Sequence, residues 1–147
     1  MAKRILVPLN RGERAESVLP LVRDMALAGG ATVRLLHVAP VAAMRTDASG
    51  RVIAYANQEG DRLEQQGLDY LRLLGAQLEG VPVENRVRFG NPREEILLEA
   101  DVFDADLIAL AAAKPRWLRP ALFGGLSERV RRQADAPVML LSARREP

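Results

Sequence analysis

The sequence predicts an α/β fold in which residues 1–147 form a single domain, a five-stranded parallel sheet with helices on both faces. Three observations lead to this fold class. Short β-branched apolar runs alternate with segments of helical periodicity, which is typical of parallel strands joined by crossover helices. The length of 147 residues is that of one compact domain. The composition, 48% hydrophobic and 27% charged, is that of a folded chain.

The first strand and helix lie close to the N-terminus. Residues 4–9 form an apolar, β-branched run of the length of a buried strand. Over residues 13–28 the apolar side chains recur at helical spacing, but Pro20 interrupts the pattern and should kink the helix or mark its real start. Residues 31–38 form the second strand.

The middle of the chain predicts a loop, a long helix and a strand. Residues 40–51 contain several turn formers and are expected to be a loop. A long helix is expected within residues 53–78. Apolar and polar residues alternate over 81–89, which predicts a half-exposed strand at a sheet edge.

A capped helix start is visible in the third quarter of the chain. Asn91 has the position of an N-cap, and Pro92 and Glu94 follow at the positions that helix starts favour. The helix should run to about residue 104. Glu94 and Glu95 are expected to be exposed acids in its first turn.

The C-terminal third predicts two strands and a basic helix. The strands are expected at residues 106–110 and 137–142, with a long loop at 112–123 and a short helix at 126–134. In open parallel sheets, ligands bind beyond the carboxyl ends of the strands, where the strand order reverses. If the first and fourth strands are neighbours there, the loops at 9–13 and 111–125 meet.

Composition excludes several classes of chemistry. The chain has no cysteine, so disulfides, thiolate metal sites and cysteine nucleophiles are excluded. Its one histidine, His37, is too few for a His-based zinc site, and we interpret it as structural. The net charge of +2 gives no reason to expect nucleic acid as a partner. With no apolar run of the ~20 residues that span a bilayer and no signal peptide, we expect no membrane association and a cytoplasmic location.

Several blocks of sequence, in their order and spacing, resemble the universal stress protein family. They are ILVPL at 5–9, LLHV at 35–38, FGNP at 89–92, EEIL at 94–97, DLI at 106–108, FGGLSERV at 123–130 and APV at 136–138. The resemblance covers nearly the whole chain. It implies a homodimer with a flavodoxin-like, adenine nucleotide alpha hydrolase-like fold, and a role in the stress response.

The resemblance also implies a nucleotide site, which this sequence matches only in part. The ATP-binding members have Gly-x-x-Gly, nine further residues and Gly-Ser or Gly-Thr, and their first strand usually ends in Asp. Here the glycine positions hold Ala111, Lys114 and Gly124, and the hydroxyl position holds Gly125. Asn10 stands where the Asp is usual. The expectation is a lost or altered nucleotide site, with ATP as the cofactor only if the remaining groups suffice.

Each candidate site residue has a structural alternative. Gly124 and Gly125 offer either an anion site at a helix start or a tight turn. Lys114 either compensates for the missing glycine or lies in a solvated basic loop. Asn10 either contacts a ribose or base, or only forms a turn. Val38, which matches the family in the second strand, completes the candidate nucleotide or anion cleft.

The resemblance over nearly the whole chain, combined with the incomplete glycine motif, implies a non-enzymatic, regulatory role, and the sequence shows no convincing catalytic constellation. An ATP-binding, nucleotide-dependent sensor is the alternative. The last strand, Val138–Leu141, is apolar and expected at a sheet edge, where an exposed strand promotes aggregation. Pairing with the same strand of a second subunit would cover it, so we expect a homodimer.

Overall fold

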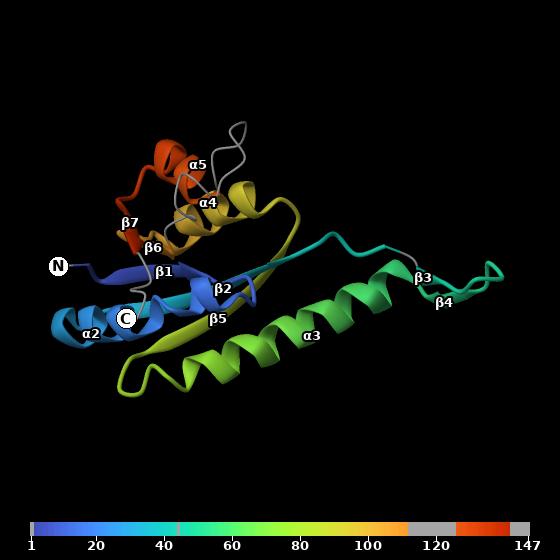
Figure 1. Ribbon diagram of the computed structural model, residues 1–147, viewed down its shortest axis with the longest axis horizontal. Coiled ribbons are helices and arrows are strands. Elements are labelled where there is room, and N and C mark those ends of the chain that lie inside the picture. Colours follow the sequence, from blue (N-terminus) through green and yellow to red (C-terminus); the bar gives the residue numbers. More distant parts are fainter. Residues whose placement is uncertain (1, 44, 112–125, 142–147) are drawn as a thin grey trace, which may run out of the picture.

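The computed structural model describes residues 2–43, 45–111 and 126–141 (Figure 1). Its main sheet has five strands in the order β5-β2-β1-β6-β7, and every pairing is parallel. The predicted fold class is therefore confirmed. The strands of this sheet are β1 (Arg4–Pro8), β2 (Thr32–Ala39), β5 (Val83–Phe89), β6 (Leu107–Ala111) and β7 (Val138–Leu141).

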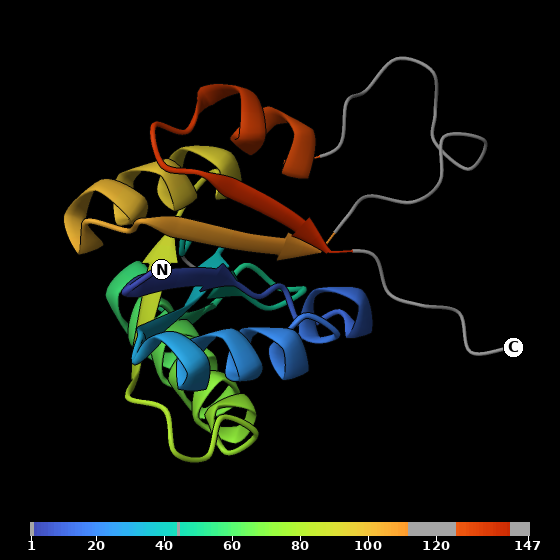
Figure 2. The same ribbon diagram turned by 90° about the vertical axis from the view of Figure 1, so that its left-hand side faces the viewer.

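The helices cover both faces of the sheet. On one face lie α1 (Glu13–Glu16), α2 (Leu19–Gly29) and α3 (Ala56–Gly75), and on the other lie α4 (Pro92–Phe103) and α5 (Leu126–Gln133) (Figure 2). Strand residues alternate between the two layers. In β1, Ile5 and Val7 are buried towards α2 and α3, whereas Leu6 is buried towards α4. Each such apolar side chain contributes about 1.5–3 kcal/mol by leaving water.

The strand order places a topological switch point between β1 and β6. From β1 the chain proceeds to β2 and then β5 on one side, and returns to build β6 and β7 on the other. The carboxyl end of β1 therefore lies beside that of β6, as the sequence predicts. The two edges of the sheet are β5 and β7, which also confirms the predicted edge positions.

Two helices begin at residues that the sequence analysis identifies as helix starts. The predicted helix over residues 13–28 is divided into α1 and α2, with Pro20 in the first turn of α2, so the proline marks a real start. Asn91 caps α4, since its side-chain oxygen accepts a hydrogen bond from the Glu94 amide at 3.2 Å.

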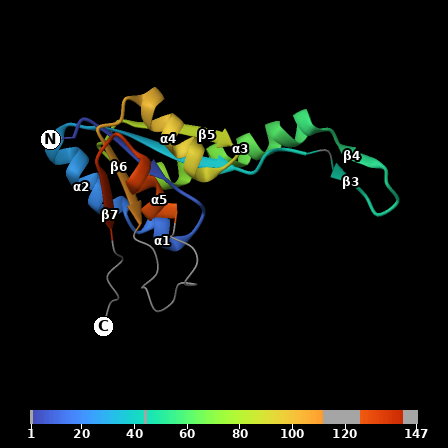
Figure 3. The ribbon, with the colours of Figure 1, turned by 90° about the horizontal axis from the view of Figure 1, so that it is seen from above.

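The predicted loop at residues 40–51 is wrong in part, because a hairpin forms there. Its strands are β3 (Arg45–Thr46) and β4 (Val52–Ala54), and α3 begins only at Ala56. Asp47 closes the turn by accepting hydrogen bonds from the amides of Ser49 and Arg51, both at 2.9 Å. The hairpin projects from the body of the domain beside the start of α3 (Figures 1 and 3). Among the described residues, no helix has both the length and the apolar character needed to cross a bilayer.

Candidate functional site

The chain makes a tight turn directly after β1, at the switch point. The Asn10 side-chain oxygen accepts a hydrogen bond from the Gly12 amide at 3.0 Å, which is an Asx turn. A Cβ at Gly12 would lie 2.9 Å from that same oxygen, so a larger residue there would make the Asn10 side chain shift. Asn10 itself is exposed. The turn thus presents its leading side chain at the edge of the sheet where ligands of such folds bind.

Arg11, at the tip of this turn, has an unusual backbone conformation. Its φ is 66°, in the left-handed region, which costs a residue with a side chain roughly 1–2 kcal/mol. The Arg11 amide donates a hydrogen bond to the Tyr70 hydroxyl at 3.0 Å, and its guanidinium lies 5.5 Å from the centre of the Tyr70 ring. Tyr70, on α3, therefore holds the turn in this conformation.

Tyr70 is held in turn by two further groups. Its hydroxyl donates to the Glu16 carboxylate at 2.7 Å, and its ring meets His37 edge-on, with 5.7 Å between the ring centres. Burial and the nearby Glu16 carboxylate raise the pKa of Tyr70 well above its usual value, so the phenol stays protonated. Nδ1 of His37 donates to the Leu9 carbonyl at 3.0 Å, because a carbonyl can only accept. His37 thus fixes the turn from behind, in agreement with its structural interpretation.

The remaining predicted site residues divide into two groups. Val38 is near the end of β2 and is partly buried against the core on the α4 side. Ala111 is the last residue of β6, in register with Leu141, and packs against the core on the opposite side. Lys114, Gly124 and Gly125 lie outside the described residues. The structure therefore places Asn10 at the switch point, with Val38 and Ala111 at the ends of the strands on either side of β1.

A second cluster of charges, which the sequence analysis missed, surrounds Glu99 on α4. The Glu99 side chain is fully buried and accepts hydrogen bonds from Arg34 at 2.7 Å, Arg88 at 2.5 Å and Arg86 at 3.3 Å. Burial raises the pKa of Glu99, but the hydrogen bonds from Arg88 and Arg34 outweigh it and leave the pKa lowered. The sequence holds a signal for this cluster, because Glu99 falls on the inward stripe of the helix that also contains Ile96.

The expectation that Glu95 is an exposed acid is wrong. Its carboxylate pairs with Arg88 at 3.0 Å, and its side chain is only 18% exposed. The reason is that β5 carries Arg88 beside the first turn of α4. Glu94, on the outer side of the same turn, is exposed as predicted.

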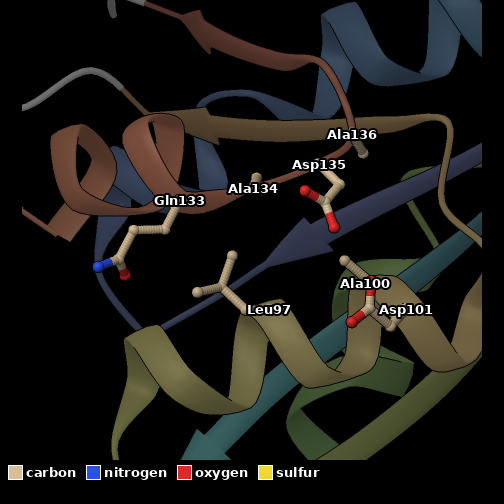
Figure 4. A pocket seen from close by; sticks show the side chains of 7 residues that line it. All are labelled: Leu97, Ala100, Asp101, Gln133, Ala134, Asp135 and Ala136. Atoms are coloured by element: carbon tan, nitrogen blue, oxygen red, sulfur yellow. The ribbon is translucent and has the colours of Figure 1, made fainter.

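Two hollows lie away from the turn after β1. One, of about 50 Å³, is between α4 and the segment that joins α5 to β7 (Figure 4). Its lining residues are Leu97, Ala100, Asp101, Gln133, Ala134, Asp135 and Ala136. The other, of about 300 Å³, is an open groove between α2 and the end of α3, lined by Pro20, Arg23, Asp24, Ala76, Gln77 and Glu79. Neither contains a residue of the candidate site. Within the described ranges, no group of three or more His, Cys, Asp or Glu side chains could hold a metal ion.

Comparison with known families and structures gives one consistent result. The model of the Universal stress protein family matches residues 1–142. No curated protein sequence matches the chain.

Solved structures share the fold over nearly the whole chain. Hypothetical protein MJ0577 is 24% identical, with a TM-score of 0.76 and coverage of 98% of both chains. A universal stress protein in complex with cAMP is 16% identical, with a TM-score of 0.72 and coverage of 95% of this chain and 97% of that one. The universal stress protein from Archaeoglobus fulgidus in complex with dAMP is 21% identical, with a TM-score of 0.57 and coverage of 94% and 96%. At these identities the likeness concerns the fold.

Proposed function

The chain belongs to the universal stress protein family, and from this premise we propose that it is a non-enzymatic, regulatory protein of the stress response with an altered nucleotide site. It acts in the cytoplasm as a homodimer. It does not bind ATP through the glycine motif that the family's ATP-binding members use.

The observation that carries this proposal is the state of the phosphate motif. Of its positions, only Gly124 is kept, while Ala111, Lys114 and Gly125 replace the two earlier residues and the hydroxyl. Glycines let a backbone approach phosphate oxygens closely, and side chains at those positions obstruct the approach. The lost hydroxyl removes a hydrogen bond worth about 1 kcal/mol. Ala111, the one changed position that the structure describes, is a strand residue packed against the core, which supports this proposal.

The bonding of the ionisable groups near the turn supports a non-enzymatic role. Tyr70 donates to Glu16 and accepts from the Arg11 amide, and His37 donates to Leu9. A general base or a nucleophile needs a group that can exchange a proton with the substrate. The Tyr70 hydroxyl and the Nδ1–H group of His37 instead form hydrogen bonds within the turn and its support, which is a positioning role.

The edge position of β7 supports the homodimer. An apolar strand at the edge of a sheet exposes unpaired backbone groups, and natural proteins cover such edges. A two-fold axis beside Val138–Leu141 would pair the strand with its own copy.

An ATP-binding sensor is the second candidate function. It is favoured by the relatives solved in complex with cAMP and with dAMP, which have this fold. In that case Asn10, Val38, Lys114, Gly124 and Gly125 would line the nucleotide cleft, with Lys114 compensating for the missing glycine.

Two measurements on the purified full chain decide between these functions. We expect mass spectrometry to find no stoichiometric nucleotide, and calorimetry to find ATP binding weaker than micromolar. Copurified ATP or micromolar affinity would instead establish the sensor. As a matched control, the triple variant Ala111→Gly, Lys114→Gly, Gly125→Ser restores the motif and should gain at least tenfold in ATP affinity. If the variant gains nothing, the motif is not the reason for weak binding.

A further inference from the structure

The outer edge of β5 presents a regular set of backbone groups. β5 lies at the end of the sheet opposite β7 and pairs with β2 alone (Figure 1). The Pro82 carbonyl and the Gly90 amide, which flank β5, both bond to β2, at 2.9 and 3.0 Å. Successive residues of a strand direct their backbone groups to opposite sides, so the even-numbered residues of β5 face β2. The N–H and C=O groups of Val83, Asn85 and Val87 therefore face the open side of the strand.

The side chain at the middle of this edge has an unpaired oxygen. Among the described residues, no group donates a hydrogen bond to the side-chain oxygen of Asn85, although that oxygen is buried. Asn85 lies on the α3 side of β5, between Val83 and Val87, which pack against the core. Buried polar groups without a partner are costly, and folded proteins normally supply one. The unpaired oxygen therefore indicates a donor that another molecule brings to this edge.

The α4 side of β5 has a charge pattern that complements itself when the strand is reversed. Glu84 and Arg86 flank Asn85, and each of the two charged side chains is 50% exposed. When two β5 strands pair antiparallel with Asn85 at the centre, Glu84 of each copy lies opposite Arg86 of the other. Opposite charges in directly opposed positions stabilise a strand pair, and like charges destabilise it. A pair centred on Arg86 would instead place that residue opposite its own copy.

The backbone and the Asn85 amide group fit the same register. With Asn85 at the centre, it forms a hydrogen-bonded pair with its own copy, because its backbone groups face outward. Val83 forms such a pair with Val87 of the second copy for the same reason. Directly opposed residues have their Cβ atoms about 4.5–5.5 Å apart, so each Asn85 side-chain nitrogen can donate to the side-chain oxygen of the other. The two-fold symmetry thus supplies both unpaired oxygens with a donor.

From these features we propose that the β5 edge is an interface at which a second copy of this chain pairs antiparallel, with the two-fold axis beside Asn85. Such a contact is isologous, so it closes on itself. It lies on the opposite edge of the sheet from β7 and does not depend on the proposed function. Where both edges pair, the β5 contact joins dimers into a larger assembly.

A disulfide crosslink tests this register directly, because the chain has no cysteine of its own. Glu84→Cys and Arg86→Cys are made separately in the full chain. In the proposed register, position 84 of one copy faces position 86 of the other with about 4.5 Å between the Cα atoms, which a disulfide can span. Two copies of the same variant place their cysteines two residues apart along the strand, beyond disulfide reach. Oxidised glutathione should therefore crosslink an equimolar mixture, whereas each variant alone should remain monomeric on a denaturing gel.

The outcomes decide for or against this interface. A mixture that crosslinks no more than the single variants overturns the inference, and so does equal crosslinking in a single variant, which would mean another register. Circular dichroism shows whether each variant folds. If one does not, sedimentation of Asn85→Ala replaces the crosslink. This variant removes the hydrogen bonds between the two amide groups and should weaken association roughly tenfold. An association constant equal to that of the wild type overturns the inference.

Discussion

Replacing Glu99 by glutamine tests how far the core on the α4 side depends on one buried charge. In the wild type this carboxylate is fully buried and faces three arginines, whose side chains are 16%, 25% and 50% exposed for Arg34, Arg88 and Arg86. Glutamine has nearly the same shape but no charge. The variant Glu99→Gln therefore removes the counter-charge of the arginines without creating a cavity.

The expected loss follows from the bonds that the carboxylate makes. Hydrogen bonds to charged groups contribute about 1.5–3 kcal/mol each when they are shielded from water. The bonds from Arg34 and Arg88, at 2.7 and 2.5 Å, meet that condition. The bond from the half-exposed Arg86, at 3.3 Å, contributes little because solvent screens it. The unfolding free energy should fall by about 3 kcal/mol, near the range known for breaking a buried ion pair.

Urea unfolding followed by circular dichroism measures this loss at neutral pH. A loss of about 3 kcal/mol corresponds to a melting temperature lower by roughly 6–12 °C in a domain of this size. The matched control is Glu94→Gln, which changes an exposed acid in the first turn of the same helix and should cost less than about 1 kcal/mol. Equal losses in the two variants would refute the argument, because the burial of Glu99 would then have no energetic consequence.

The pH dependence of the same variant has a definite sign. The folded-state pKa of Glu99 is lowered from its usual 4.5, so ionised Glu99 contributes stability above the unfolded-state value. That contribution is lost as the pH falls through the folded-state pKa. The difference between wild type and Glu99→Gln should therefore be largest near neutral pH and shrink below pH 4.5.

Two further variants test the support of the turn and the packing of α3. Tyr70→Phe removes the hydroxyl that the Arg11 amide and the Glu16 carboxylate bind. It should therefore lower the unfolding free energy by roughly 1–2 kcal/mol and speed hydrogen exchange at the Arg11 amide. Unchanged exchange would contradict the supporting role of Tyr70. Gly67→Ala adds a Cβ only 2.8 Å from a methyl group of Val87. It should therefore lower the unfolding free energy, measured by urea unfolding, by about 1–3 kcal/mol, although alanine has the higher helix propensity. A stabilised Gly67→Ala variant would mean that α3 can move away from the sheet at no cost.

Most of the architecture could be predicted because each element carries its own local signal. The β-branched runs, the Pro20 start and the Asn91 cap act within a few residues, so no tertiary information is needed to see them. The β3–β4 hairpin carries a local signal only in its turn, not in its strands. Its strands are too short for a hydrophobic alternation, and its turn depends on the hydrogen bonds of Asp47.

For the candidate site, the sequence predicts the residue that faces outward from the turn but not the residues that support the turn from behind. Asn10 follows a strand that the sequence identifies, and the switch-point rule places it. The support behind it comes from Tyr70, which is 59 residues away from Arg11 in the chain. Their meeting depends on how closely α3 approaches the sheet, which Gly67 permits at one position. No short motif encodes such a contact.

In the turn after β1, the groups that support the backbone differ from the group that faces outward, and the two can be varied independently. Tyr70 and His37 hold its backbone from behind, while the Asn10 amide faces forward. A substitution behind the turn should therefore change stability and exchange rates. A substitution of Asn10 by aspartate should leave both unchanged, because it keeps the acceptor for Gly12. If Asn10→Asp speeds hydrogen exchange at the Arg11 amide as strongly as Tyr70→Phe does, the turn is not held independently by its support on α3.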